Sequence, residues 1–190
     1  MNTRWFILLL ALFGVSCRSN MNSSLVVSKM VLGTLTTVAG PPAYSYCTYD
    51  PGATEFDFAQ IDPTANSGGT MGAVVDNNLA DTSTLNGVLR TSSSNFHPHQ
   101  VVADYQETQP GGITVTQQII PVAGTVVPPG GKGAVLVPFF APIPATLLTG
   151  IVRVTFHIEG VLDDGSNVRT SEREYIFVTC STAGCNSPCL

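Results

Sequence analysis

The clearest pattern in the chain lies near its C-terminal end, where apolar and polar residues alternate. Val152, Val154, Phe156 and Ile158 are each separated by one polar residue. A period of two predicts a strand with one buried face and one face in solvent. The strand is followed by Asp-Asp-Gly-Ser at residues 163–166, and Asp-Gly is a strong hairpin signal because both residues tolerate positive φ. We therefore predict a β-hairpin here.

A two-residue loop of Asp164 and Gly165 would set the register of this hairpin, because residues equally far from the loop then face each other. The predicted pairs are Val154 with Tyr175 and Val152 with Phe177 on the buried face, and His157 with Glu172 and Thr155 with Glu174 on the outer face. Arg153 lies diagonal to Glu174 in the same register. The outer pairs are ordinary cross-strand polar contacts.

Other segments combine β-branched or alternating residues with Gly and Pro turns. The predicted strands are residues 25–37, 44–49, 55–61, 70–75, 88–91, 99–106, 113–120 and 134–140. The alternation at 55–61 places Phe56 and Phe58 towards the core. Pro138 predicts an edge strand or a bulge, because proline lacks a backbone donor. With no helical periodicity after residue 16, the pattern predicts an all-β domain, an antiparallel β-sandwich of immunoglobulin-like type, over residues 25–190.

The apolar run at the start of the chain indicates export. Arg4 precedes the apolar residues 5–13, and Gly14, Val15 and Ser16 follow. A cation, an apolar stretch and small residues form the layout of a secretory signal peptide. The run is shorter than the roughly 20 residues that a spanning helix needs. We predict a cleaved signal helix at residues 1–16 and a small, polar tether at residues 17–24.

Cys17 is the predicted lipidation site. Small residues followed directly by cysteine resemble a bacterial lipobox, although Gly14 stands where leucine is usual. Ordinary signal peptidase cleavage before Cys17 is the alternative. The chain has five cysteines, and lipidation of Cys17 leaves four that can pair. By resemblance to bacterial lipoproteins in general, Arg18 after the cysteine implies the outer membrane.

The four remaining cysteines are predicted to form structural disulfides. They are Cys47, Cys180, Cys185 and Cys189. We expect Cys47 to pair with one cysteine of the tail and the other two to pair locally, because exported proteins meet an oxidising environment. A zinc site is the rival interpretation, but the tail spacing lacks the paired Cys-x2-4-Cys arrays of such sites.

The composition bounds the class of partner. The chain has 190 residues, 8 Lys and Arg against 13 Asp and Glu, and a net charge of −5. This mildly acidic balance, with no basic cluster, argues against nucleic acid. Only 11% of residues are charged, and the many turn-forming residues fit one exported β-domain.

Candidate chemistry is sparse. His97 and His99 would share one face of a strand as a potential metal pair, but Pro98 lies between them and no carboxylate has a matching spacing. The sequence has no Gly-x-Ser-x-Gly elbow. Residues 130–133 lack the spacing of a phosphate loop and suit a turn. The carboxylates at 163–164 and at 172 and 174 fall in a turn and on a solvated face. We expect no catalytic residue, no metal and no cofactor.

One family resemblance covers most of the chain after the signal. It consists of residues 74–79, 89–91 with Asn95 and Phe96, 101–105, the hairpin at 152–165, and 175–180, in this order. This order resembles uncharacterised envelope lipoproteins that are numerous in myxobacteria. The resemblance implies lipidation, an envelope location and a sandwich fold, and it implies no catalytic residue.

These observations predict a non-catalytic, lipid-anchored protein of the bacterial envelope, a structural or interaction module at the outer membrane. Its partners would be the membrane, through the N-terminal lipid, and a protein or glycan. One alternative is a glycan or small-ligand binding module that uses Tyr44, Tyr46 and Tyr49 as a stacking platform. A metal-dependent enzyme built on the histidines is the other.

Overall fold

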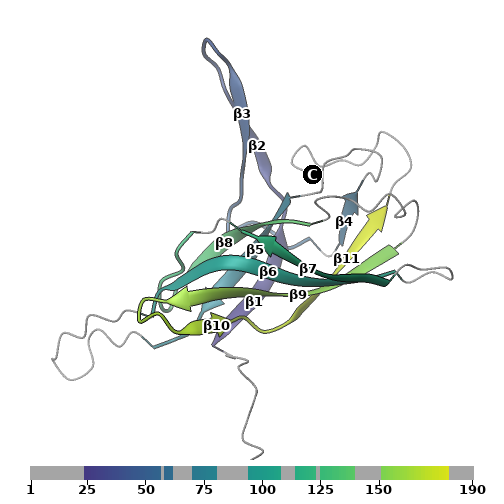
Figure 1. Cartoon of the computed structure of the whole chain (residues 1–190). Helices are drawn as coiled ribbons and strands as arrows, with labels where there is room; N and C mark the ends of the chain where they lie inside the picture. Colours follow the sequence, from purple (N-terminus) through teal and green to yellow (C-terminus); the bar gives the residue numbers. More distant parts are fainter. Residues whose placement is uncertain are drawn as a thin grey trace, which may run out of the picture.

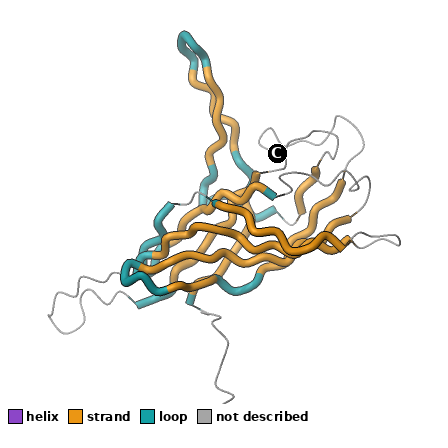
Figure 2. Tube along the Cα trace, viewed as in Figure 1, coloured by secondary structure: helices purple, strands orange, loops and turns teal. Residues whose placement is uncertain are grey.

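The computed structural model of the chain describes residues 24–56, 58–61, 70–80, 94–107, 114–122, 125–139 and 151–179. Within these ranges every regular element is a strand, which confirms the predicted all-β class (Figure 2). The strands are β1 (Leu25–Val31), β2 (Thr34–Val38), β3 (Tyr44–Thr48), β4 (Phe58–Ile61), β5 (Thr70–Asn77), β6 (Phe96–Glu107), β7 (Thr114–Pro121), β8 (Lys132–Pro138), β9 (Ile151–Leu162), β10 (Asn167–Arg169) and β11 (Arg173–Thr179). The prediction for residues 88–91 lies outside the described residues.

Two sheets pack face to face, and a separate two-stranded ribbon leaves them (Figure 1). The smaller sheet has the strand order β1-β5-β8, and the larger has β4-β11-β9-β6-β7, with β10 paired to β9. The pairs are antiparallel except β4 with β11, which are parallel. The strand β8 lies at the edge of the described sheet, where Pro138 is tolerated as predicted. The finer prediction of an immunoglobulin-like topology remains a prediction.

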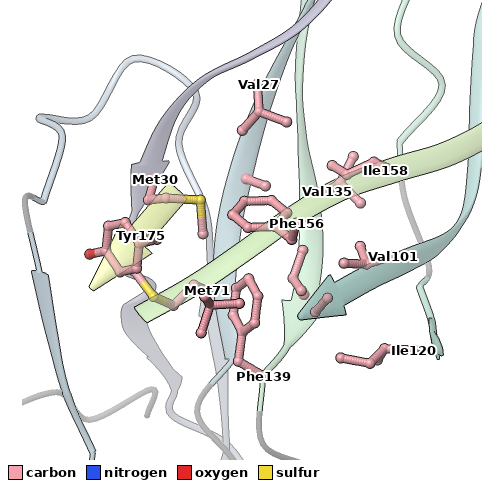
Figure 3. Packing of buried hydrophobic residues seen from close by; sticks show 14 of the residues in the cluster. Val27, Met30, Met71, Val101, Ile120, Val135, Phe139, Phe156, Ile158 and Tyr175 are labelled. Atoms are coloured by element: carbon pink, nitrogen blue, oxygen red, sulfur yellow. The ribbon is translucent and has the colours of Figure 1, made fainter. Parts of the chain in front are cut away.

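The core lies between the two sheets and takes mostly alternate residues from β1, β5, β6, β8, β9 and β11. Figure 3 shows Val27, Met71 and Val135 of the smaller sheet facing Val101 and Phe156 of the larger one. Each apolar side chain buried in this way contributes roughly 1.5–3 kcal/mol to stability. Beside them the ring of Phe139 lies 5.2 Å from those of Phe156 and Phe177, in edge-on or tilted contact.

The C-terminal hairpin has the predicted core register and a different turn. Val154 pairs with Tyr175, and Val152 with Phe177, as predicted. The loop, however, has three residues, because the Leu162 amide donates to the Ser166 carbonyl at 3.0 Å and Gly165 has a φ of 82°. A glycine in the left-handed region is the usual end of a three-residue hairpin loop.

A bulge restores the register beyond this turn. The Thr170 amide donates to the Ile158 carbonyl at 2.9 Å, whereas Arg173 pairs with Phe156. From Thr170 to Arg173 the chain therefore advances by three residues, whereas the partner strand advances by two, from Ile158 to Phe156. The predicted pairing of His157 with Glu172 is wrong, because Glu172 lies within this irregular stretch.

The prediction for residues 55–61 is wrong about which side chains are buried. The strand is shorter, β4, and Phe58 pairs with Ile176 of β11. Ile176 faces outward, because its neighbours Tyr175 and Phe177 point into the core. Phe56 and Phe58 are accordingly 46% and 50% exposed. Alternation identified a strand here but not its buried face.

The segment predicted as one strand over residues 25–37 is two strands. The first, β1, belongs to the smaller sheet, and β2 pairs with β3 in a hairpin that projects from the body of the molecule (Figure 1). Both hairpin strands are rich in Thr, Val and Tyr, which favour extended backbone. Residues 39–43 join them at the tip, with a cis Pro41–Pro42 peptide bond.

Candidate functional site

The projecting hairpin is the most distinctive surface of the described structure. Residues 30–49 contain no Asp, Glu, Lys or Arg. Thr34, Leu35 and Thr37 are exposed on β2, and Leu35 retains 44% of its accessible surface. Among the described residues β2 and β3 pair only with each other. The hairpin therefore presents two uncharged strand edges, a feature that natural proteins use for pairing or else protect with charges.

The chain fastens the base of the hairpin to the smaller sheet. Tyr49 lies over Gly72 of β5, where an added Cβ would come within 3.1 Å of the Tyr49 side chain, and its hydroxyl donates to the Thr70 carbonyl at 3.2 Å. Burial raises the pKa of the Tyr49 hydroxyl. Further along, the Lys29 ammonium donates to the Ala53 carbonyl at 2.5 Å. Residues 49–53 thus form a strap across the outer face of the sheet.

A cleft of about 620 Å³ lies between this strap and the edge strand β8. Tyr49 and Pro51 line one side, and Ala134 and Leu136 line the other. The outer face of β8 supplies Ala134 and Leu136 because Val135 and Val137 point into the core. The volume falls within the range of about 300–1,000 Å³ that is typical of small-ligand sites.

Lys132 supplies the positive charge at the cleft. Its ammonium lies 2.8 Å from an Asp76 carboxylate oxygen, and the second oxygen of Asp76 accepts a bond from the Ser28 hydroxyl, also at 2.8 Å. The Lys132 side chain is 60% exposed. Because an ammonium has three donors, it retains capacity for a second acceptor beside Asp76.

Of the three tyrosines predicted as a stacking platform, Tyr49 is the one whose side chain the structure describes. Tyr44 and Tyr46 belong to β3, and their side chains lie outside the described part of the molecule. Tyr49 is half-buried against Gly72 and forms a wall of the cleft. Tyr49 is partly exposed at the cleft, because the strap holds one side of its ring against the smaller sheet. The stacking platform remains a prediction.

Of the four cysteines predicted to form disulfides, Cys47 is the one that lies within the described residues. Cys47 lies on β3 opposite Leu35, and its sulfur is not a free thiol. Cys180, Cys185 and Cys189 fall outside the described residues. The disulfide connectivity therefore remains a prediction. Cys17, the predicted lipidation site, also lies outside the described residues, as do the signal peptide and most of the tether.

The two histidines proposed as a metal pair have different surroundings. The His97 Nε2 lies 2.6 Å from an Asp163 oxygen, and the Asn95 amide donates to the other oxygen at 2.9 Å. His99 is exposed at a register shift between Pro98 and Gln100. Together, Asn95 and His97 fasten the hairpin turn to the start of β6. No group of three His, Cys, Asp or Glu that suits a metal ion is found within the described ranges.

His157 and Glu159 form a small polar cluster on the outer face of the larger sheet. A Glu159 oxygen accepts a bond from the Gln100 amide at 2.5 Å, and the His157 Nε2 lies 3.4 Å from the other oxygen. The Gln100 bond, followed by His157, lowers the pKa of Glu159 despite some desolvation. The neighbour of His157 is therefore Glu159 and not the predicted Glu172.

Asn77 is a structural residue whose importance sequence analysis missed. It is fully buried at the end of β5. Its amide nitrogen donates to the carbonyls of Ser94 and Val127 at 2.8 and 2.9 Å, and its oxygen accepts from the Leu79 amide at 3.1 Å. An Asn-Asn pair before a loop indicates a turn, and only the fold reveals that its first member joins three segments.

The fold and surface define an all-β protein with two packed antiparallel sheets and a protruding hairpin. In the described part of the chain, no helix has the length and apolar character needed to cross a membrane. Comparison with protein-family models finds no match, and comparison with curated proteins finds none either. The resemblance to envelope lipoproteins therefore remains a prediction from the sequence.

Proposed function

We propose that the protein is a lipid-anchored module of the bacterial cell envelope that has no catalytic role and binds a partner through the β2–β3 hairpin. One observation carries this proposal. The chain enters the domain at Leu25, at the start of β1, and the hairpin leaves at the opposite end of the molecule (Figure 1). An anchor at Cys17 would therefore hold the hairpin away from the membrane.

The tether length supports this arrangement. Seven residues, 18–24, separate Cys17 from Leu25, and a fully extended chain of that length reaches at most about 25 Å. The domain would stay near the membrane, with its uncharged hairpin as the distal feature. Among the described strands β2 and β3 pair with each other alone, and the outer edges of such hairpins can bind extended polypeptide through backbone hydrogen bonds, which favours a protein partner.

The anchor is tested by intact-mass analysis of the protein purified from its native membrane, with and without reduction and alkylation. We expect a chain that begins at Cys17, carries acyl chains and contains two disulfides. Cys17→Ser is expected to release the protein from the membrane fraction. A wild-type chain that begins at Cys17 without added lipid would contradict the anchor.

The interaction surface is tested by a photo-cross-linking side chain at Thr37 on the hairpin, with the same side chain at Glu172 on the sandwich as the matched control. Both positions are exposed. We expect a discrete cross-linked protein in native cells from position 37 and none from position 172. Equal products from both positions, or a product from position 172 alone, would contradict the hairpin as the binding surface.

A further inference from the structure

The cleft beside β8 has the composition of a binding site that is separate from the hairpin edges. We propose that it binds a small organic acid, with the apolar body between Tyr49, Pro51 and Leu136 and the carboxylate at Lys132. This proposal concerns a second site and does not depend on the hairpin having a protein partner.

The apolar side chains that line the cleft indicate that the proposed ligand has an apolar body. The Tyr49 ring is held in place by its bond to the Thr70 carbonyl and by contact with Gly72, so the wall exists before a ligand arrives. Opposite it, Ala134 and Leu136 lie on the outer face of β8. A preformed wall lowers the cost of binding, because little conformational entropy is lost.

The Lys132 ammonium indicates that the proposed ligand has an acidic group. Lys132 is the one charged residue that lines the described cleft, and Thr125 adds a hydroxyl group, whereas the Thr48 hydroxyl already donates to the Thr34 carbonyl. The neighbouring Asp76 holds the Lys132 ammonium at 2.8 Å and so orients it. A carboxylate at the cleft would accept a charge-assisted hydrogen bond, which is about twice as strong as a neutral one. A neutral analogue of the same shape would lose that bond.

The only tryptophan of the chain is Trp5, in the predicted signal peptide. A full-length Trp5→Phe chain with Thr125→Trp therefore carries a single reporter at the cleft. The matched reporter is Val126→Trp, at the next residue, which is exposed and does not line the cleft. The probe is octanoate, which has a carboxylate and an apolar body, and its neutral counterpart is octanamide.

We expect octanoate to change the fluorescence of Thr125→Trp in a saturable manner and to leave Val126→Trp unchanged. Lys132→Gln is expected to weaken binding about tenfold or more, the usual effect of losing a hydrogen bond to a charged group. Arg153→Gln is the matched control, because Arg153 is an exposed cation 3.3 Å from Glu174, outside the cleft. Octanamide is expected to bind more weakly than octanoate.

Ala134→Phe provides a steric test, because the larger side chain would occupy the cleft from the outer face of β8. It is expected to abolish the octanoate response, while urea unfolding verifies that the variant is folded. The proposal is overturned if no saturable response occurs, if Val126→Trp responds equally, or if Lys132→Gln and Arg153→Gln weaken binding to the same extent. Equal affinity for octanamide would also overturn it.

Discussion

At the scale of single residues, a buried polar side chain can join segments that are far apart in the sequence. Asn77 is the clearest example, because its amide joins the end of β5 to the residues that precede β6 and β8. An apolar replacement would leave the part-buried Ser94 carbonyl and Leu79 amide without this partner, while the Val127 carbonyl would keep its bond from the Phe96 amide. Buried groups without hydrogen bonds cost about 1–3 kcal/mol each.

We predict that Asn77→Ala lowers the free energy of unfolding by about 3 kcal/mol, for this reason. Urea denaturation followed by circular dichroism measures the change. The control is Asn78→Ala, because the neighbouring Asn78 is exposed and such surface substitutions usually stay within about 0.5 kcal/mol. Similar effects of the two substitutions would contradict the assigned role of Asn77.

Glu159 makes stability depend on pH at the acidic side. Its pKa is lowered from an ordinary value of 4.5, first by the Gln100 hydrogen bond and then by His157. The folded state therefore favours the charged carboxylate. Its contribution is fully present above the unfolded pKa and is lost as the pH falls through the lower folded pKa.

We predict that Glu159→Gln is less stable than the wild type at neutral pH and that this difference closes as the pH falls below 4.5. Urea midpoints at neutral pH and at several acidic values provide the measurement. Glu172→Gln is the control on an exposed carboxylate. A difference for Glu159→Gln that widens with acid would show that the sign of the linkage is wrong.

At the scale of elements, the C-terminal hairpin shows which features a local sequence pattern predicts and which it does not. The alternation from Val152 to Ile158 and the Asp-Gly signal predicted the core pairs of β9 and β11. They did not predict the three-residue loop or the bulge after Thr170. The bulge lies beside a contact with the other sheet, where the Ser171 amide donates to the Leu25 carbonyl at 2.9 Å.

Phenylalanines on β4 and β11 give a test of the sheet assignment. We predict that Phe58→Ser changes the free energy of unfolding by less than about 1 kcal/mol, because its ring is half exposed. Phe177→Ala is expected to cost about 3–5 kcal/mol, because Phe177 is fully buried beside Phe139. Chemical denaturation of both variants measures this difference. A larger loss from Phe58→Ser than from Phe177→Ala would contradict the placement of β4.

At the scale of the whole molecule, the packed sheets of the sandwich supply the buried core that stabilises the fold, and the β2–β3 hairpin adds an exposed surface. None of the fully buried hydrophobic residues identified in the described core belongs to β2 or β3. A two-stranded hairpin by itself is marginally stable in water. The projecting part is therefore expected to exchange its amide hydrogens faster than β9.

We predict that a shortened hairpin leaves the sandwich intact. Replacing residues 36–46 with Asn-Gly keeps the pair of Leu35 and Cys47 and closes it with a favoured two-residue turn. The free energy of unfolding is expected to change by less than about 1 kcal/mol, because no described core residue is removed. Urea denaturation measures it, and loss of the cooperative transition would assign the hairpin a structural role.

The sequence alone was sufficient for the all-β class, for most strand positions and for the core pairs of the last hairpin. These features depend on the period of two and on turn residues, which act over a few neighbouring positions. The tertiary structure decided that Phe56 and Phe58 face outward, that Asn77 is buried, and that residues 34–48 leave the sandwich. It also placed Tyr49 beside β8 to form the cleft. Each of these depends on which distant strands meet, and a local pattern carries no information about that choice.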